Sequence, residues 1–186
     1  GIVGRAAALA LSRLGLSVAL PAPAADHAAR GDDVRCYALN AASVALLESL
    51  KVWAALPADT RTPVYDMRIE GDAGAASALH FSAWQQQVRE LAWIVDAAAL
   101  EAELASALRY APHVVLGGEA VPAALVVVAE GKASATREQF GVAFERHDYG
   151  QRAIAARLHA SEPHQGLARQ WFRAPDILAL LPTDRD

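Results

Sequence analysis

The chain reads Ala129-Glu130-Gly131-Lys132-Ala133-Ser134-Ala135-Thr136-Arg137 at the point that says most about its fold. This stretch follows an apolar run, 124–128, whose composition predicts a fully buried strand. A buried strand that ends in a turn with an acid and a glycine, followed by Ser and Arg, is typical of a sheet edge where a phosphate-bearing cofactor binds. The stretch therefore predicts an α/β fold with a ligand at the carboxyl edge of its sheet.

The opening residues, Gly1-Ile2-Val3-Gly4, favour the same fold. They lead into an Ala/Leu-rich helix, 6–15, and then a short strand, 16–20. Glycines before a helix of small residues leave backbone N–H groups free to hold a pyrophosphate. An alanine-rich core helix behind a glycine loop explains the same residues equally well, since a full G-x-G-x-x-G would need glycines before residue 1. The chain begins inside this motif and not at Met, so we expect it to be incomplete at both ends.

Composition limits the classes of function. The 186 residues are 54% hydrophobic and carry a net charge of −4, which gives no basic surface for nucleic acid. Cys36 is the single cysteine, so no internal disulfide forms and a reducing compartment is expected. None of the six histidines has partners at the spacing of a zinc site, and we expect no metal.

Helical and strand patterns alternate early in the chain, and its later part is richer in strands. Asp96 is a candidate N-cap for a strong helix over 96–110, and a second helix is expected over 38–50. Two strands, 64–69 and 78–81, are expected to pair across a glycine turn. Further strands are expected over 91–95, 113–116, 168–172 and 177–181.

Seven segments in order resemble the group A FAD-dependent aromatic monooxygenases. More specifically, they resemble the ubiquinone-biosynthesis hydroxylase family, which is related to para-hydroxybenzoate hydroxylase. The resembling segments are Gly1-Ile2-Val3-Gly4; the D-x-R segment over 33–43 with the Trp53 segment that follows it; 91–96; the acid-Gly motif over 129–137; the Y-x-Q segment over 149–154; and the strands 168–172 and 178–182.

The resemblance implies an α/β fold in which a FAD-binding Rossmann-like three-layer domain is interrupted by a mostly antiparallel substrate-domain sheet. The FAD-binding domain would take residues 1–63 and 96–145, and the sheet would take 64–95 and 146–186. The implied activity is hydroxylation of an aromatic ring with NAD(P)H and O2, in ubiquinone biosynthesis. The implied cofactors are FAD and, as co-substrate, NAD(P)H.

The resemblance also implies site residues. Those that would bind cofactor are Gly1, Gly4, Arg35, Glu130, Gly131 and Arg137, and those that would line the substrate pocket are Trp171 and Phe172. Ser134 is expected to cap the segment after the acid-Gly turn, which is a structural role. No catalytic side chain is predicted, because the cofactor carries the chemistry and the protein orients it.

The chain departs from the family pattern at several positions. The acid expected to bind the adenosine ribose would fall near Pro21, and the nearest acid, Asp26, lies in a loop where we do not expect it to substitute. The helix after Asp96 has Ala98 where an arginine is usual and Glu101 where a glutamine is usual, and Glu130 replaces an aspartate.

These departures keep two alternatives open. One is a flavin-dependent reductase or dehydrogenase on the same fold, and the other is a degenerate, non-catalytic partner in a quinone-synthesis complex. The expected partner is a small aromatic or polyprenyl-phenol substrate, with no nucleic acid. The expected location is cytoplasmic, while peripheral contact with the inner membrane and a homodimer stay open. The sequence does not specify the substrate, the ring position or NADH versus NADPH.

Overall fold

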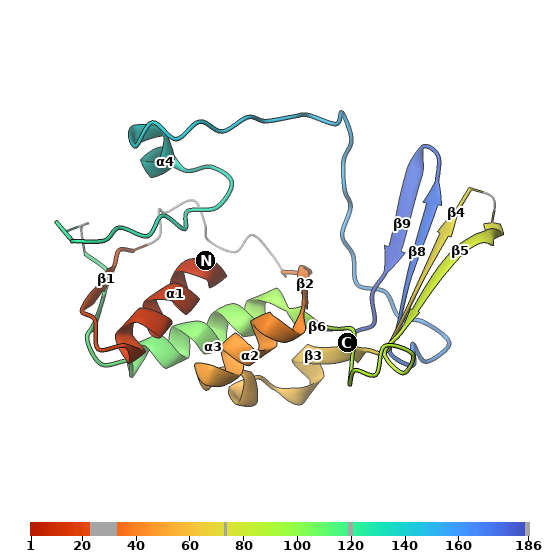
Figure 1. Cartoon of the computed structure of the whole chain (residues 1–186), viewed down its shortest axis with the longest axis horizontal. Helices are drawn as coiled ribbons and strands as arrows, with labels where there is room; N and C mark the ends of the chain where they lie inside the picture. Colours follow the sequence, from red (N-terminus) through yellow and green to blue (C-terminus); the bar gives the residue numbers. More distant parts are fainter. Residues whose placement is uncertain (23–32, 73, 119–120, 185–186) are drawn as a thin grey trace. The chain divides into compact units, whose positions relative to one another are not determined.

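A computed structural model describes residues 1–22, 33–72, 74–118 and 121–184 and shows a mixed α/β chain with several sheets (Figure 1). The predicted role of Asp26 lies outside the described residues. The helices are α1 (Ile2–Arg13), α2 (Ala41–Ser49), α3 (Ala97–Arg109), α4 (Ala135–Gln139) and the 3-10 turns η2 (Trp53–Ala55) and η3 (Ala58–Thr60). The strands are β1 (Val18–Leu20), β2 (Cys36–Leu39), β3 (Arg61–Val64), β4 (Asp66–Gly71), β5 (Gly74–Ser82), β6 (Ala92–Asp96), β7 (Val114–Leu116), β8 (Leu167–Arg173) and β9 (Asp176–Leu180).

The chain divides into two compact units. The first unit comprises Gly1–Asp33 with Leu100–Ala155, and the second comprises Val34–Ala99 with Ala156–Asp186. Helix α3 begins in the second unit and continues in the first. The domain ranges expected from the sequence stay a prediction.

In the first unit, β1 and β7 pair in parallel, with Val18 opposite Val114. Helix α1 precedes β1, and its last turn is tied to the segment just before β7, because Ser12 Oγ donates to the Pro112 carbonyl oxygen. The helix begins four residues earlier than the predicted start at residue 6. It ends as predicted before Gly15, whose φ of 79° reverses the chain toward β1.

The predicted buried strand over 124–128 is wrong. No residue of the run belongs to a strand, and Leu125 is 67% exposed while Val128 is 39% exposed. Apolar composition alone does not make a strand, since each strand also needs a neighbour for its backbone hydrogen bonds. Within the described residues the β1–β7 sheet has two strands and does not include this run. The segment 149–154, which resembles a family strand, also lacks strand structure.

In the second unit, β6 lies between β2 and β3 in an antiparallel sheet. Its core holds Val64 and Ile94 together with Ala168 of β8. The predicted helix over 38–50 is shortened at its start because Ala38 and the following residue pair with β6. Helix α2 begins instead after Asn40, whose side chain accepts a hydrogen bond from the Ser43 N–H at 2.9 Å.

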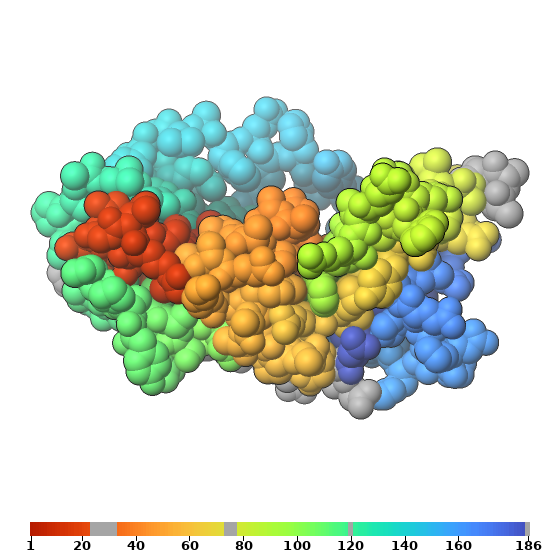
Figure 2. Space-filling view, turned by 60° about the horizontal axis from the view of Figure 1, so that its bottom comes forward, coloured from red at the N-terminus to blue at the C-terminus, as the bar shows by residue number. Residues whose placement is uncertain are grey.

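The second sheet of this unit has the strand order β5-β4-β8-β9. The hairpins β4–β5 and β8–β9 are antiparallel, the first as the sequence predicts, whereas the central β4–β8 pair is parallel. Figure 2 shows the yellow surface of β4 beside the blue surface of β8 and β9. The sheet is therefore mostly antiparallel.

Candidate functional site

The glycine-containing start of α1 lies against the turn that contains the acid-Gly motif. A Cβ atom built on Gly4 would be 3.4 Å from the Ala129 Cβ atom. Gly1 is the N-cap of α1 and provides no side-chain hydrogen bond, and the first turn contains no acid. The first N–H groups of a helix have no acceptor within the helix, and the helix dipole makes this end positive. The first unit thus joins two predicted cofactor-binding motifs at one uncapped helix end.

Arg5 connects α1 to α3. Its guanidinium NH1 donates to the Glu101 backbone carbonyl oxygen at 3.0 Å and to Glu101 Oε2 at 3.2 Å. Both side chains are about a quarter to a third exposed, so water screens part of this attraction. Glu101 occupies the position where the family resemblance predicts a glutamine. The glutamate found in place of the expected glutamine is therefore paired with Arg5 of the neighbouring helix.

The carboxylate of Glu130 is hydrogen-bonded to residues of its own turn. It accepts hydrogen bonds from Ser134 Oγ at 2.6 Å, from the Thr136 N–H at 3.2 Å and from the Thr136 hydroxyl. These hydrogen bonds, led by that of Ser134, lower the pKa of the Glu130 carboxyl below its ordinary value, and the positive charge of Arg137 adds to the effect. The carboxylate therefore stays charged and holds the turn closed.

Ser134 caps α4, as predicted. Its Oγ accepts from the Arg137 N–H at 3.1 Å. The Arg137 guanidinium turns back on the motif, donating to the Gly131 carbonyl oxygen at 3.4 Å and to the Lys132 carbonyl oxygen at 3.2 Å. It also lies 4.2 Å above the Phe144 ring. Three of the predicted cofactor-binding residues, in positions 130, 131 and 137, thus form one compact turn.

Arg35, a further predicted cofactor-binding residue, belongs to the second unit. It lies exposed immediately before β2, and its carbonyl oxygen accepts from the Ala97 N–H at 3.0 Å. This bond ties the start of β2 to the start of α3. The predicted cofactor contact of Arg35 stays a prediction.

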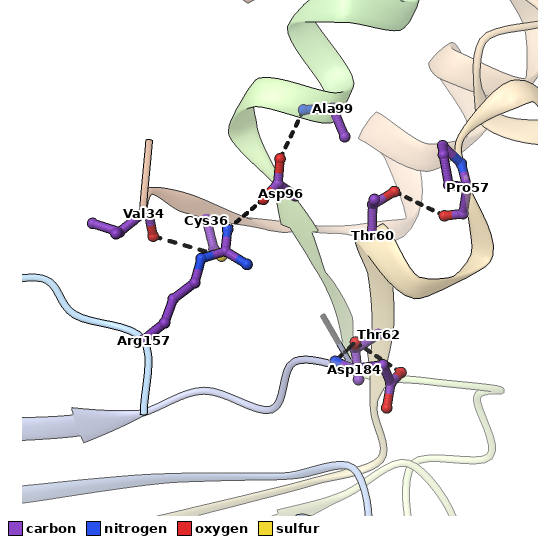
Figure 3. Close-up of polar contacts among 9 residues, drawn as sticks. All are labelled: Val34, Cys36, Pro57, Thr60, Thr62, Asp96, Ala99, Arg157 and Asp184. Atoms are coloured by element: carbon purple, nitrogen blue, oxygen red, sulfur yellow. Dashed lines mark hydrogen bonds and ion pairs between the residues drawn. The ribbon is translucent and has the colours of Figure 1, made fainter. Parts of the chain in front are cut away.

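A buried carboxylate marks the start of α3 (Figure 3). Asp96 is 4% exposed, and its Oδ1 accepts from the Ala99 N–H at 2.7 Å, which makes it the N-cap that the sequence predicts. Its Oδ2 is paired with the Arg157 guanidinium. Arg157 was not predicted as a partner, because the residue lies 61 positions further along in a segment without helix or strand.

A second polar cluster joins β3 to the end of the described chain. Thr62 is 2% exposed, and its Oγ1 donates to Asp184 Oδ2 at 2.9 Å while accepting from the Asp184 N–H at 3.0 Å. The His164 ring accepts from the Gly166 N–H at Nδ1, so Nε2 carries the proton donated to Asp184 Oδ1 at 3.0 Å. The Thr62 hydroxyl contacts the carboxylate and not the imidazole. The arrangement holds chain segments together and does not pair a nucleophile with a base.

Trp171 and Phe172 lie on opposite faces of the four-stranded sheet, because successive residues of a strand alternate. Trp171 pairs with Leu178, and Phe172 pairs with Ile177. One face carries exposed apolar side chains of three strands, Leu79, Phe81, Phe172 and Ile177. The two predicted pocket residues therefore contribute to different surfaces.

The described residues contain no cluster of three or more His, Cys, Asp or Glu side chains suited to a metal ion. Across the same residues, each helix is too short or too polar to cross a membrane.

The chain matches no protein-family model. It is similar to ubiquinone hydroxylase UbiL of Rhodospirillum rubrum, with 28% identity over 98% of this chain and 47% of the relative. It is also similar to 3-demethoxyubiquinol 3-hydroxylase of Escherichia coli, with 29% identity over 98% of this chain and 52% of the relative. The chain thus spans about half the length of these curated relatives.

One solved structure with a similar fold is a mutant of P. aeruginosa PqsL. The match has a TM-score of 0.64 and 20% identity, and it covers 80% of this chain and 46% of the PqsL chain.

Proposed function

We propose that this chain, a homologue of ubiquinone-biosynthesis hydroxylases over 98% of its length, belongs to a FAD-dependent monooxygenase. The enzyme would use NAD(P)H and O2 to hydroxylate an aromatic ring in ubiquinone biosynthesis. The observation that carries the proposal is the close approach of Gly4 in α1 to Ala129 in the acid-Gly turn. Two motifs about 125 positions apart in the sequence thereby meet at a helix end suited to a phosphate group.

The residues present fit a dinucleotide. The uncapped start of α1 offers backbone N–H donors at Gly1 and Gly4, and a Cβ atom on Gly1 would meet nothing within 4 Å. Gly131 and Arg137 would form the adjoining wall, and cofactor binding by Arg35 stays a prediction from the sequence. Because the Glu130 carboxylate is already bound within its turn, its role would be to shape that turn. FAD, when bound, would supply the hydride acceptor and the oxygen chemistry.

We also propose the finer architecture expected from the family. A FAD-binding Rossmann-like three-layer domain would comprise residues 1–63 and 96–145, and the substrate-domain sheet would comprise 64–95 and 146–186. The parallel β1–β7 pair and the mostly antiparallel β5-β4-β8-β9 sheet support this assignment. The likeness to PqsL over 80% of the chain supports it as well.

The proposed substrate is a small aromatic or polyprenyl-phenol compound. The exposed apolar side chains on one face of β5, β8 and β9 support an apolar substrate, with Phe172 as a contact on that face. A polyprenyl substrate would bring a cytoplasmic enzyme to the surface of the inner membrane. A homodimer and the choice between NADH and NADPH are matters for experiment.

The test is flavin content. The chain and a longer natural form that contains it would be purified, and their visible absorbance recorded before and after denaturation. We expect the longer form to release FAD and to consume oxygen when given NAD(P)H and a phenolic quinone precursor. A longer form that is colourless and does not bind added FAD would contradict the proposal. That result would favour the alternative of a degenerate, non-catalytic partner in a quinone-synthesis complex.

The reductase alternative gives a different result in the same assay. Oxidation of NAD(P)H with reduction of an isoprenoid acceptor and no oxygen uptake would support a flavin-dependent reductase or dehydrogenase. The oxygen electrode therefore separates the two flavoenzyme classes.

A further inference from the structure

A cavity lies beside α4 in the first unit and has basic side chains in its wall. Its volume is about 660 Å³. The ionisable side chains that line it are Lys132, Arg137, Glu138 and Arg146. Three positive charges thus face one negative charge in a chain whose net charge is −4, so the local charge is opposite to the overall charge.

Two of these cations are available to a ligand. Among the described residues, the Lys132 ammonium and the Arg146 guanidinium form no side-chain hydrogen bond or ion pair. Glu138 also lines the cavity but is not paired with either of them. Two unpaired cations that line one cavity repel each other, and an anion bound between them relieves this repulsion.

The third cation is fixed in place. The Arg137 guanidinium is held by the carbonyl oxygens of Gly131 and Lys132 and by the Phe144 ring. Its Nε atom is buried without a hydrogen-bond partner in the described structure. A buried donor without an acceptor is uncommon. Arg137 therefore gives the cavity a positive charge that needs little reordering when an anion enters.

We propose that this cavity binds a phosphate monoester of a nucleotide, with Lys132 and Arg146 as its direct contacts. Guanidinium and ammonium groups form short, charge-assisted hydrogen bonds with phosphate oxygens. Lys132 and Arg146 both line the cavity, so one anion in it can contact two cations, which an exposed lysine alone does not offer. The identity of the nucleotide rests on the proposed function, in which NAD(P)H is the co-substrate. NADPH carries a 2′-phosphate monoester and NADH does not, so a monoester site would favour NADPH over NADH.

The experiment is a calorimetric titration of the chain at low ionic strength with 2′-AMP, 5′-AMP, inorganic phosphate and adenosine. We expect the phosphate ligands to bind, adenosine not to bind, and the affinity to fall as salt is added. Tighter binding of 2′-AMP would identify the adenosine 2′-phosphate as the source. Equal binding of both monoesters would identify nucleotide monophosphates in general.

Two paired variants of equal charge test the assignment. Lys132→Gln with Arg146→Gln should weaken phosphate binding at least about tenfold, since two charge-assisted hydrogen bonds are lost. Lys51→Gln with Arg152→Gln removes the same charge elsewhere and should leave the affinity within about twofold of the parent. Circular dichroism checks that both variants fold.

Equal affinity of the parent and the Lys132→Gln, Arg146→Gln variant would overturn the proposal, as would adenosine binding as tightly as 2′-AMP. The outcome is independent of the flavin test. A protein that retains FAD but binds no phosphate at this cavity disproves only this inference. Phosphate binding in a protein that never takes up FAD disproves only the proposed function.

Discussion

Gly166 occupies a position that no other residue can take without strain. Its φ is +68°, and a Cβ atom there would lie 2.6 Å from Tyr65 Cδ2 and 3.1 Å from the Pro63 carbonyl oxygen. We expect Gly166→Ala to lower the free energy of unfolding by about 2–4 kcal/mol, from left-handed backbone strain together with overpacking. Urea denaturation measures the loss.

Gly15 provides the matched control for this substitution. Its φ is +79°, but a Cβ atom there would meet nothing within 4 Å. Gly15→Ala should therefore cost only the backbone strain, about 1–2 kcal/mol. Equal losses at the two glycines would show that the contact with Tyr65 has no energetic consequence.

Glu130 gives the acid-Gly turn a defined pH dependence. The hydrogen bonds from Ser134 and Thr136 lower the pKa of this carboxyl in the folded state relative to the unfolded state. A lowered folded-state pKa means that the stabilisation is fully present above the unfolded value and is lost as the pH falls through the folded value. We expect NMR titration to give a Glu130 midpoint below that of an ordinary glutamate, and Glu130→Gln to remove this acid dependence.

Glu138 is the control for the Glu130 prediction, because it lies in α4, just after the turn, and its carboxylate has no such set of hydrogen bonds among the described residues. Glu138→Gln should leave the acid dependence of the turn intact. A Glu130 midpoint at or above the ordinary glutamate value would refute the stated role of Ser134.

At the scale of single residues, the sequence predicted short-range partners and missed distant ones. Asp96 and Ser134 were expected as caps because a cap bonds an N–H group only a few positions away. The partners Arg157 and Asp184 could not be expected, since they lie 61 and 122 positions from Asp96 and Thr62. No local pattern encodes such a distance.

Gly4 lies where α1 faces the acid-Gly turn. A Cβ atom at 3.4 Å from the Ala129 Cβ is an ordinary contact, so Gly4→Ala should fit and stabilise α1 by about 0.5–1 kcal/mol through helix propensity. Gly4→Leu should displace the turn and lose this gain. Urea midpoints of the two variants measure the difference. A leucine variant as stable as the alanine variant would mean that the turn moves without cost.

The ion pair between Asp96 and Arg157 links the start of α3 to the segment that contains Arg157. Arg157→Gln should cost about 1–3 kcal/mol, because it removes a hydrogen-bonded charge from a buried carboxylate. Asp96→Asn keeps an N-capping oxygen but loses the ion pair.

A double-mutant cycle over these two positions measures the coupling between them. We expect a coupling free energy of about 1 kcal/mol or more, in view of the direct contact. Additive losses in the double variant would indicate that each side chain acts through other neighbours.

Among the elements, pairing across a short turn was predicted and pairing between distant segments was not. The β4–β5 hairpin was expected from alternation and a glycine turn, which lie within a few residues of each other, while β8 and β9 were expected as strands without an assigned partner. The parallel pairing of β4 with β8 depends on residues about 100 positions apart and could not be predicted. The run 124–128 had the composition of a buried strand but lacks a strand partner in the described structure.

For the molecule as a whole, the exposed run 124–128 predicts poor solution behaviour. Leu125, Val126 and Val127 are each more than half exposed and lie consecutively. Contiguous exposed apolar surface promotes association. We expect Val126→Thr with Val127→Thr to reduce binding of a hydrophobic dye and to shift the chain toward the monomer in sedimentation, without loss of helix content. The buried pair Val64→Thr with Val95→Thr should instead unfold the second unit.

The parallel pairing of β4 with β8 also affects the order in which the four-stranded sheet can form. Each flanking hairpin closes a short loop, so pairing within β4–β5 and within β8–β9 costs little loop-closure entropy. The seam between them closes a loop of about 100 residues, and that entropy must be lost before any contact across it is gained. Until then each hairpin has an open inner edge with unsatisfied backbone groups. We therefore expect the pairing of β4 with β8 to carry the largest loop-closure cost in this sheet, and the open edges before it to be the stage most exposed to aggregation.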